Sequence, residues 1–314
     1  MTPVADTIPY TVIGGYLGAG KTTLLNNLLR NSQGLRLAVL VNDFGDINID
    51  ADLITSHDGE TINLASGCIC CSLADGFMLA LNRVSKRRGE IDHIVVEASG
   101  VADPAKIGHY GAVLKLDLQG VIVLADAEQV REKAASKYVG DTVVRQLQGA
   151  DLIVLNKVDL VTPAQLASVR SWLADLAPGA HIVEAVSGQL PLSVLLGTLH
   201  EPAPADEETP GEHAPAADHP PAAEHEPAHE SMYRTWSFTA ETPVDRADLL
   251  TLLELLGEST LRAKGFVHLA DDPSRRYLLQ LVGRRWKLAP DEAWGAATPQ
   301  TRLVFIGLRS AHRS

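Results

Sequence analysis

All three cysteines of this 314-residue chain stand within four positions, at Cys68, Cys70 and Cys71. Three thiolates in a turn that follows a glycine can converge on one ion at about 2.3 Å, the usual zinc–sulfur distance, and leave one corner of the tetrahedron open. An open corner suits a site that must release its metal. Adjacent cysteines are poor partners for an ordinary disulfide. The spacing therefore predicts a metal site, with three buried inert thiols and a redox sensor as alternatives.

A second chemical motif lies near the N-terminus, where "GGYLGAGKTT" matches the G-x-x-x-x-G-K-[ST] pattern of phosphate-binding loops. Glycines let main-chain N–H groups wrap the phosphates, the lysine reaches the β- and γ-phosphates, and the threonine hydroxyl holds Mg²⁺. A tight glycine turn that only packs a helix on a sheet is the alternative. The residues expected at the nucleotide are Gly15, Gly18, Ala19, Gly20, Lys21, Thr22 and Thr23, with Lys21 and Thr22 also catalytic and Thr22 the Mg²⁺ ligand.

The segment "VLNKVDL" places Asn156, Lys157 and Asp159 after an apolar strand, in the N-K-x-D arrangement that reads guanine. A carboxylate at Asp159 can accept hydrogen bonds from the ring N–H and the exocyclic amine of guanine, whereas adenine offers no matching pair of donors. We therefore expect GTP and GDP to bind far more tightly than ATP. A solvated strand-end turn is the alternative. A P-loop kinase for a small molecule is disfavoured, because such a kinase needs no base-reading motif.

A third strand-end segment, "IVVEASGVADP", supplies Glu97 and Gly100. At this place ordinary GTPases have Asp-x-x-Gly, with the acid near Mg²⁺ and the glycine N–H on the γ-phosphate, so Glu97 and Gly100 are candidate catalytic residues. The alternative is that Glu97 is a solvated acid at a strand end. Val101 stands where Ras-type proteins have a glutamine that orients water, which predicts slow intrinsic hydrolysis without a partner.

These motifs need a sheet whose strands end beside one another. Between Tyr10 and about His200, short β-branched apolar runs such as "YTVIG", "IDHIVVE" and "ADLIVLN" alternate with longer helical patterns. Strands of this continuous apolar type, separated by helices, predict a parallel sheet with helices on both faces. We therefore expect an α/β P-loop NTPase domain over residues 1–200.

Residues 201–231 are rich in proline, alanine and acids and almost without large apolar side chains. Such a segment cannot offset the entropy cost of ordering, so we predict a disordered linker. Its histidines stand beside carboxylates, which predicts either a weak site for divalent transition metals or a plain solubilising tether. They are His213, His219, His225 and His229.

The formal net charge of −12 is concentrated in this linker. It holds nine acids and no lysine or arginine, which leaves about −3 for the rest of the chain. No basic stripe for a phosphate backbone remains, so we expect no nucleic-acid partner. No apolar run approaches the ~18 residues of a membrane span, and the N-terminus lacks the pattern of a signal peptide. We therefore expect a cytoplasmic protein without a membrane partner.

Residues 232–314 return to alternating apolar patterns. We expect strands at "MYRTWSFTA", "LRAKGFVHLAD", "RRYLLQLVG" and "TRLVFIGLR", and a helix at "RADLLTLLELL". These elements predict a small C-terminal α+β domain of roughly 80 residues.

The P-loop, the Glu97-x-x-Gly100 segment, the N-K-x-D motif and the cysteine triplet together resemble the CobW-like metallochaperone family of P-loop GTPases. The segment "VNDFGDINID" is similar to that family's switch segment, which usually has glutamate where this chain has Asp43 and Asp46. The C-terminal "LRAKGFVHLAD" and "TRLVFIG" are similar to the family's small C-terminal domain. Relatives are attached to cobalamin synthesis, nitrile hydratase activation and survival under zinc limitation.

This resemblance implies Mg²⁺-dependent hydrolysis of GTP to GDP, coupled to delivery of Zn²⁺ or Co²⁺ from the Cys-x-Cys-Cys site to a client metalloprotein. It adds Asp43 to the catalytic candidates and leaves a nucleotide-dependent homodimer open. The fourth metal ligand is left among Asp43, Asp46, Glu97 and His109. The alternative function is a metal buffer or sensor that GTP gates, without delivery to a client.

Overall fold

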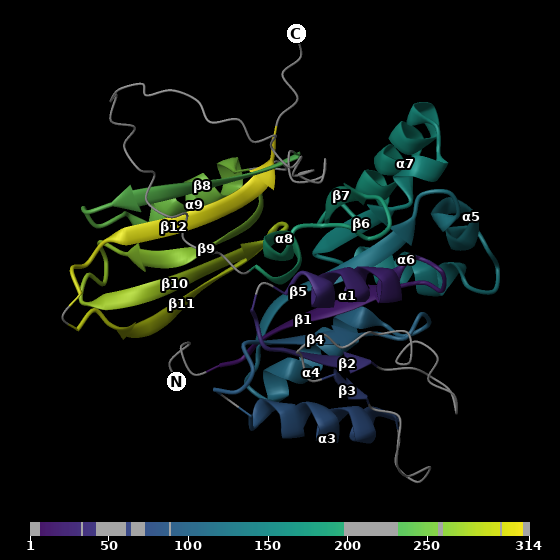
Figure 1. Cartoon of the computed structure of the whole chain (residues 1–314). Coiled ribbons are helices and arrows are strands. Elements are labelled where there is room, and N and C mark those ends of the chain that lie inside the picture. The colour runs from purple at the N-terminus through teal and green to yellow at the C-terminus, as the bar shows by residue number, and fades with distance from the viewer. Residues whose placement is uncertain are drawn as a thin grey trace, which may run out of the picture.

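The computed structural model describes residues 7–32, 34–41, 61–63, 73–87, 89–197, 232–256, 260–295 and 297–309 (Figure 1). Within these ranges, one sheet has seven parallel strands in the order β3-β2-β4-β1-β5-β6-β7, and a second has five antiparallel strands in the order β11-β10-β9-β12-β8. The predicted α/β fold with a small α+β domain after it is confirmed. The predicted linker at 201–231 lies outside the described residues, and the domain limits at 200 and 231 stay a prediction.

The parallel strands are β1 (Pro9–Gly15), β2 (Leu37–Val41), β3 (Thr61–Asn63), β4 (His93–Glu97), β5 (Asp117–Asp126), β6 (Leu152–Asn156) and β7 (His181–Ala185). The helices around them are α1 (Lys21–Arg30), α3 (Leu73–Ser85), α4 (Pro104–Val113), α5 (Val130–Ala134), α6 (Gly140–Gln148), α7 (Pro163–Leu176) and α8 (Leu192–Leu196). No helix among the described residues has the length and apolar character that crossing a membrane requires.

Helices cover both faces of the parallel sheet because its central strands are apolar on both sides. On one face, α1 and α8 pack against β1, β2, β5, β6 and β7 in a continuous core. On the other face, α3 and α4 pack against β1, β2 and β4, while α6 and α7 pack against β5 and β6. Because the strands are parallel, the carboxyl ends of β1, β4, β5 and β6 meet at one edge of the sheet. The strand order reverses at this place, and ligands of α/β proteins bind there.

The C-terminal sheet contains β8 (Tyr233–Ala240), β9 (Thr260–His268), β10 (Arg275–Val282), β11 (Arg285–Ala293) and β12 (Thr301–Leu308). Helix α9 (Arg246–Leu255) covers one of its faces through Leu249 and Leu253. Strand β11 was not predicted from the sequence. The strand contains Pro290, which has no N–H group to donate a hydrogen bond between strands. This proline is tolerated because β11 lies at the edge of the sheet.

One buried arginine joins the two sheets. Arg262 on β9 is 3% exposed and donates to the carbonyl oxygens of Val194 (2.5 Å), Leu195 (2.7 Å) and Gln119 (2.9 Å). Burial lowers the pKa of its guanidinium to about 10, so the group is charged at neutral pH. Tyr233, Leu261 and Ile306 extend the α1 and α8 core into the C-terminal sheet, so apolar packing surrounds this polar contact.

Replacing Arg262 by Met should destabilise the protein, because three main-chain carbonyls would lose their donor. An unsatisfied buried acceptor costs about 1–3 kcal/mol, so we expect the free energy of unfolding to fall by about 3 kcal/mol after partial repacking. Chemical denaturation measures this change. Arg309→Met, at an exposed arginine, is the matched control and should change stability by less than about 0.5 kcal/mol. Equal stabilities of the two variants would contradict the role of Arg262.

Candidate functional site

The phosphate-binding loop runs from the end of β1 to the start of α1 and packs directly on the neighbouring strands. Gly15 and Gly20 have φ angles of +134° and +103°, in the region that side chains rarely adopt. A Cβ at Gly15 would lie 2.5 Å from the carbonyl oxygen of Leu124 on β5. A Cβ at Gly20 would overlap the side-chain amide of Asn156 on β6. The loop therefore keeps its shape only with glycine at both positions.

Lys21 begins α1 and reaches back over the loop. Its side chain is 8% exposed, and its Nζ donates to the carbonyl oxygen of Gly15 at 2.9 Å. Thr22, in the same helical turn, is half-buried, and Thr23 is exposed. This arrangement places an ammonium group and a hydroxyl beside a helix N-terminus, where anions bind.

The side-chain amide of Asn156 ties three segments together. Its Nδ2 donates to the carbonyl oxygen of Ala19 in the loop at 2.9 Å, and its Oδ1 accepts from the N–H of Gly188 at 2.9 Å. The residue is 2% exposed, so both bonds are shielded from water. Ser187, before Gly188, accepts through its carbonyl oxygen from Asn27 Nδ2 of α1 at 2.8 Å. The end of β6, the P-loop and the turn after β7 therefore form one unit.

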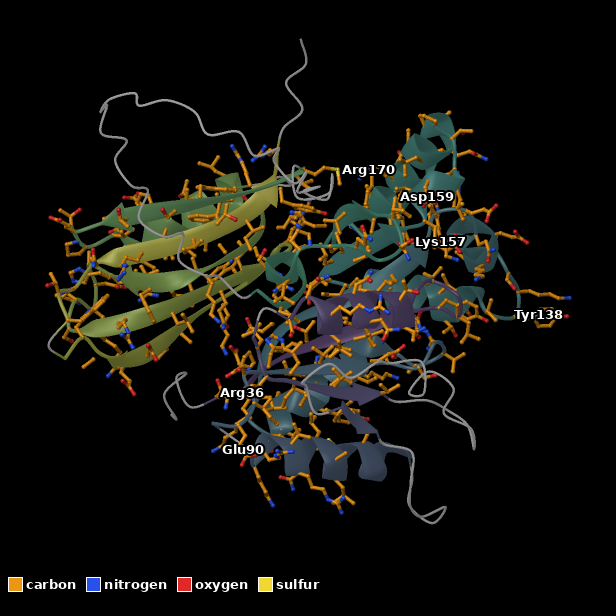
Figure 2. All side chains as sticks on the ribbon, viewed as in Figure 1. Arg36, Glu90, Tyr138, Lys157, Asp159 and Arg170 are labelled. Atoms are coloured by element: carbon orange, nitrogen blue, oxygen red, sulfur yellow. The ribbon has the colours of Figure 1, made fainter. Side chains whose placement is uncertain are left out.

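The next residues of the N-K-x-D motif follow from the end of β6 (Figure 2). Lys157 has a φ of +62°, and its Nζ forms an ion pair with Asp126 Oδ2 at 2.7 Å. The other carboxylate oxygen of Asp126 accepts from the N–H groups of Glu128 and Gln129. Asp159 lies in the short turn η2 (Val158–Leu160) and is exposed. Lys157 is thus held in place, while the carboxylate of Asp159 is accessible to a base.

Glu97 is the last residue of β4, in register with Ile13 of β1 and Val41 of β2, and it is 2% exposed. Gly100 follows in a loop that touches the P-loop, since a Cβ there would lie 2.5 Å from Leu17 Cδ2. The structure therefore brings both predicted residues of this segment next to the phosphate-binding loop. Val101 is 53% exposed.

Sequence reasoning missed four residues that hold this edge together. Gln146 on α6 donates from Nε2 to the carbonyl oxygens of Gly100 (3.1 Å) and Ala102 (2.7 Å). Lys133 on α5 donates to the carbonyl oxygen of Leu17 at 2.9 Å. The others are Asp126 and Gly188. The position of Asp126 at a strand end was a usable signal, whereas the two helical residues show no local pattern.

The predicted metal ligands are placed only in part. Cys68, Cys70, Cys71, Asp43 and Asp46 lie outside the described residues, as do the linker histidines. Within the described ranges, no three His, Cys, Asp or Glu side chains gather where they could share one ion. His109 lies on α4, donates from Nδ1 to the carbonyl oxygen of Ala105 at 2.7 Å, and borders a pocket between the two sheets.

Two family comparisons cover most of the chain. Residues 9–184 match the family described as CobW/HypB/UreG, nucleotide-binding domain, and residues 233–313 match the cobalamin synthesis protein cobW C-terminal domain. The chain belongs to the CobW-like family of P-loop GTPases. This membership confirms the predicted family and the predicted class of enzyme.

Individual members of the CobW-like family align over nearly the whole chain. The zinc chaperone CobW of Sinorhizobium sp is 33% identical, over 96% of this chain and 93% of its own length. The zinc chaperone YjiA of Escherichia coli (strain K12) is 30% identical, over 98% of this chain and 95% of its own length. The crystal structure of Zn(II)-bound YjiA GTPase from E. coli is 27% identical, covers 98% of this chain and 95% of that chain, and has a TM-score of 0.45.

Replacing Asn156 by Ala should weaken GDP binding by at least about tenfold, because the amide that positions the P-loop is lost. The unpaired groups of Ala19 and Gly188 should also lower the free energy of unfolding by about 2 kcal/mol. Calorimetric titration with GDP and thermal unfolding measure the two effects. Asn31→Ala, at an exposed asparagine after α1, is the matched control. Wild-type GDP affinity in Asn156→Ala would show that the amide does not position the loop.

Proposed function

We propose that this GTPase uses its nucleotide cycle to load zinc at a thiolate site and to deliver it to a client metalloprotein. The position of Asn156 is the observation that supports nucleotide binding in this proposal. Its side chain bonds to the P-loop, and it directly precedes the turn that would read guanine. The names of the relatives, which are zinc chaperones, support zinc as the cargo. Cobalt(II), which the sequence left open, is the second candidate cargo.

The nucleotide chemistry follows from the residues at the carboxyl edge of the sheet. Main-chain N–H groups between Gly15 and Thr23 bind the phosphates, and Lys21 contacts the β- and γ-phosphates. Thr22 and Glu97 would hold Mg²⁺, which neutralises charge on the β- and γ-phosphate oxygens when bound. Asp159 accepts the two donors of guanine.

Hydrolysis transfers the γ-phosphoryl group of GTP to water and releases GDP, so a water molecule must be oriented in line with the bond that breaks. Val101 has an aliphatic side chain, which can neither orient water nor accept its proton. Its exposed position leaves room for a polar group from another molecule. We therefore expect slow hydrolysis by the protein alone and acceleration by its client.

The proposed cargo site consists of Cys68, Cys70 and Cys71. Asp43, from the switch-like segment, is a further candidate catalytic residue at the nucleotide. In sequence, the cysteines stand between β3 and α3, so they follow the carboxyl end of a strand parallel to β1 and β4. That end belongs to the same sheet edge as the P-loop. A site that follows this edge is suited to respond to the γ-phosphate.

A metal buffer or sensor gated by GTP is the alternative, and one measurement separates it from delivery. A chaperone should hydrolyse GTP faster and lose zinc faster when its metal-free client is added. A buffer should show the same rates with and without the client.

Asp159→Asn should reverse the base preference. An amide at this position presents a donor to the amine of guanine, so GTP affinity should fall on the order of 100-fold. Xanthosine triphosphate has a carbonyl where guanine has the amine, so its affinity should rise. Calorimetry with both nucleotides measures the ratio, with ATP as the control that wild-type protein binds far more weakly than GTP. An unchanged ratio would remove Asp159 from the base site.

Zinc affinity should depend on the nucleotide. A coupling of roughly 1–3 kcal/mol would change the zinc dissociation constant by roughly 5- to 150-fold between GDP and a non-hydrolysable GTP analogue. Competition with a chelator at constant Mg²⁺ measures both constants. Replacing Cys68, Cys70 and Cys71 together by Ser is the control and should abolish tight binding. Equal zinc affinities in the two nucleotide states would contradict the proposed cycle.

A further inference from the structure

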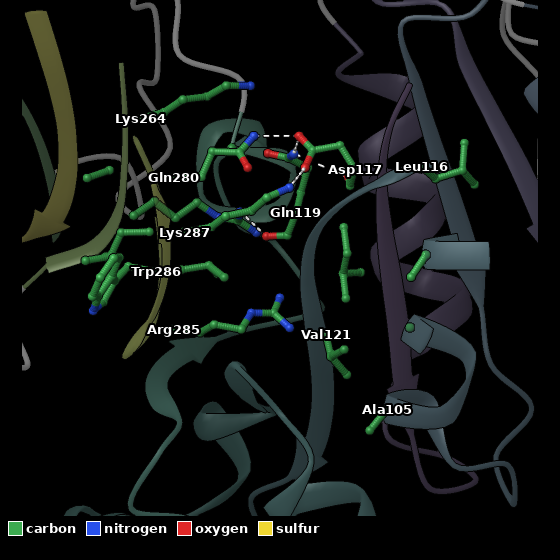
Figure 3. Close-up of a pocket in the computed structure, with 18 of the residues that line it drawn as sticks. Ala105, Leu116, Asp117, Gln119, Val121, Lys264, Gln280, Arg285, Trp286 and Lys287 are labelled. Atoms are coloured by element: carbon green, nitrogen blue, oxygen red, sulfur yellow. Dashed lines mark hydrogen bonds and ion pairs between the residues drawn. The ribbon is translucent and has the colours of Figure 1, made fainter. Parts of the chain in front are cut away.

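A pocket of about 420 Å³ lies between the two sheets, away from the nucleotide edge (Figure 3). One wall comes from α4 and the first residues of β5, and the other from β9, β10 and β11. The P-loop follows the carboxyl end of β1, whereas this pocket borders the amino end of β5. Its volume falls in the range of small-molecule sites, which are typically about 300–1,000 Å³.

The lining combines an apolar body with several polar groups. Leu116, Leu118 and Val121 line the pocket from the first sheet, and Val282 lines it from the second. A ligand held here must therefore have an apolar part that this wall can cover.

Three cations extend from the C-terminal sheet toward β5 (Figure 3). They are Lys264, Arg285 and Lys287. Arg285 forms an ion pair with Asp151 at 2.9 Å, and Lys287 lies 3.6 Å from Asp117. Arg262, which lines the same pocket, donates to main-chain carbonyls and has no carboxylate in contact among its described neighbours. The cations therefore outnumber the carboxylates.

The negative charge of Asp117 is already balanced by neighbouring donor groups. Its Oδ2 accepts from Gln119 Nε2 at 2.6 Å and from Gln280 Nε2 at 2.5 Å, in addition to the contact with Lys287. The carboxylate is 7% exposed and has these donors on both sides of the pocket. It is therefore poorly placed to attract a cationic ligand.

Lys264 differs from Arg285 and Lys287, which each lie near a carboxylate. It is half-buried on β9 and lines the pocket, and within the described part of the chain its ammonium group makes no hydrogen bond or ion pair. The pKa of Lys264 is lowered, mainly by burial and also by the charge of Arg262, while the charge of Asp117 opposes this shift. A half-buried ammonium group that forms no ion pair is incompletely solvated, and an anion in the pocket would offset that cost.

We propose that this pocket binds a small organic anion, in which a carboxylate, phosphate or sulfonate meets Lys264 and Lys287 and an apolar body packs against Leu116, Leu118 and Val121 of the first sheet. Arg285 lies on the same face of β11 as Lys287 and adds a further positive charge to the lining. The site is separate from the nucleotide site.

The experiment compares two fluorescent probes that share an aromatic body. Anilinonaphthalenesulfonate carries an anion, and phenylnaphthylamine is its neutral counterpart. Full-length protein is first saturated with GDP and Mg²⁺ so that the P-loop is occupied. We expect the sulfonate to bind at one site per chain and at least tenfold more tightly than the neutral probe.

Two variants locate the site. Lys264→Met should weaken binding of the sulfonate at least fivefold and leave the neutral probe unchanged. Ala112→Trp, at an exposed position of α4 on the rim of the pocket, should weaken both probes at least tenfold while every cation stays in place. Lys106→Met, at an exposed lysine of α4 outside the pocket, should bind both probes like the wild type.

Thermal unfolding and basal GTP hydrolysis, which should be unchanged in Ala112→Trp, show that this variant is folded. Equal affinities of the two probes for wild-type protein would overturn the anion preference. Wild-type binding of the sulfonate by folded Ala112→Trp would overturn the location.

Discussion

The nucleotide edge depends on one steric constraint, the close approach of the P-loop main chain to β5 and β6. At Gly15 the approach is limited by the carbonyl oxygen of Leu124, and at Gly20 by the side chain of Asn156. Any side chain at these two positions would push the loop away from the sheet. The same closeness lets the end of β6 hold the loop through one amide, so the phosphate and base ends of the site are positioned by a common element.

That amide uses its donor and its acceptor in opposite directions, which fixes its orientation. The Asn156 amide also connects to the turn after β7 through Gly188, and that turn is fastened to α1 through Asn27. Lys157 is held separately by Asp126 at the end of β5. A nucleotide that spans the edge therefore meets a frame that is already in place, which reduces the entropy cost of binding.

Strand β5 connects the two functional regions at its opposite ends. Asp126 ends it at the nucleotide edge, and Asp117 begins it at the pocket between the sheets. Helix α4 makes the same connection, since it starts shortly after Gly100 and borders the pocket at Ala105. Because Arg262 fixes the C-terminal sheet at this far end, the sheet stays clear of the carboxyl edge (Figure 1). The described part of the C-terminal domain therefore does not cover the nucleotide edge.

Local patterns in the sequence were sufficient for the nucleotide motifs and the fold class. Strand-end motifs such as Gly15 to Thr22 and Asn156 to Asp159 can be recognised from a few consecutive residues. Continuous apolar strands separated by helices indicate a parallel sheet covered on both faces. Strand β11 was missed because Pro290 and exposed polar positions hide an edge strand. Gln146, Lys133, Gly188 and Arg262 were missed for another reason. Their partners are distant in the chain, so only tertiary packing decides that these side chains hold the P-loop edge and the domain contact together.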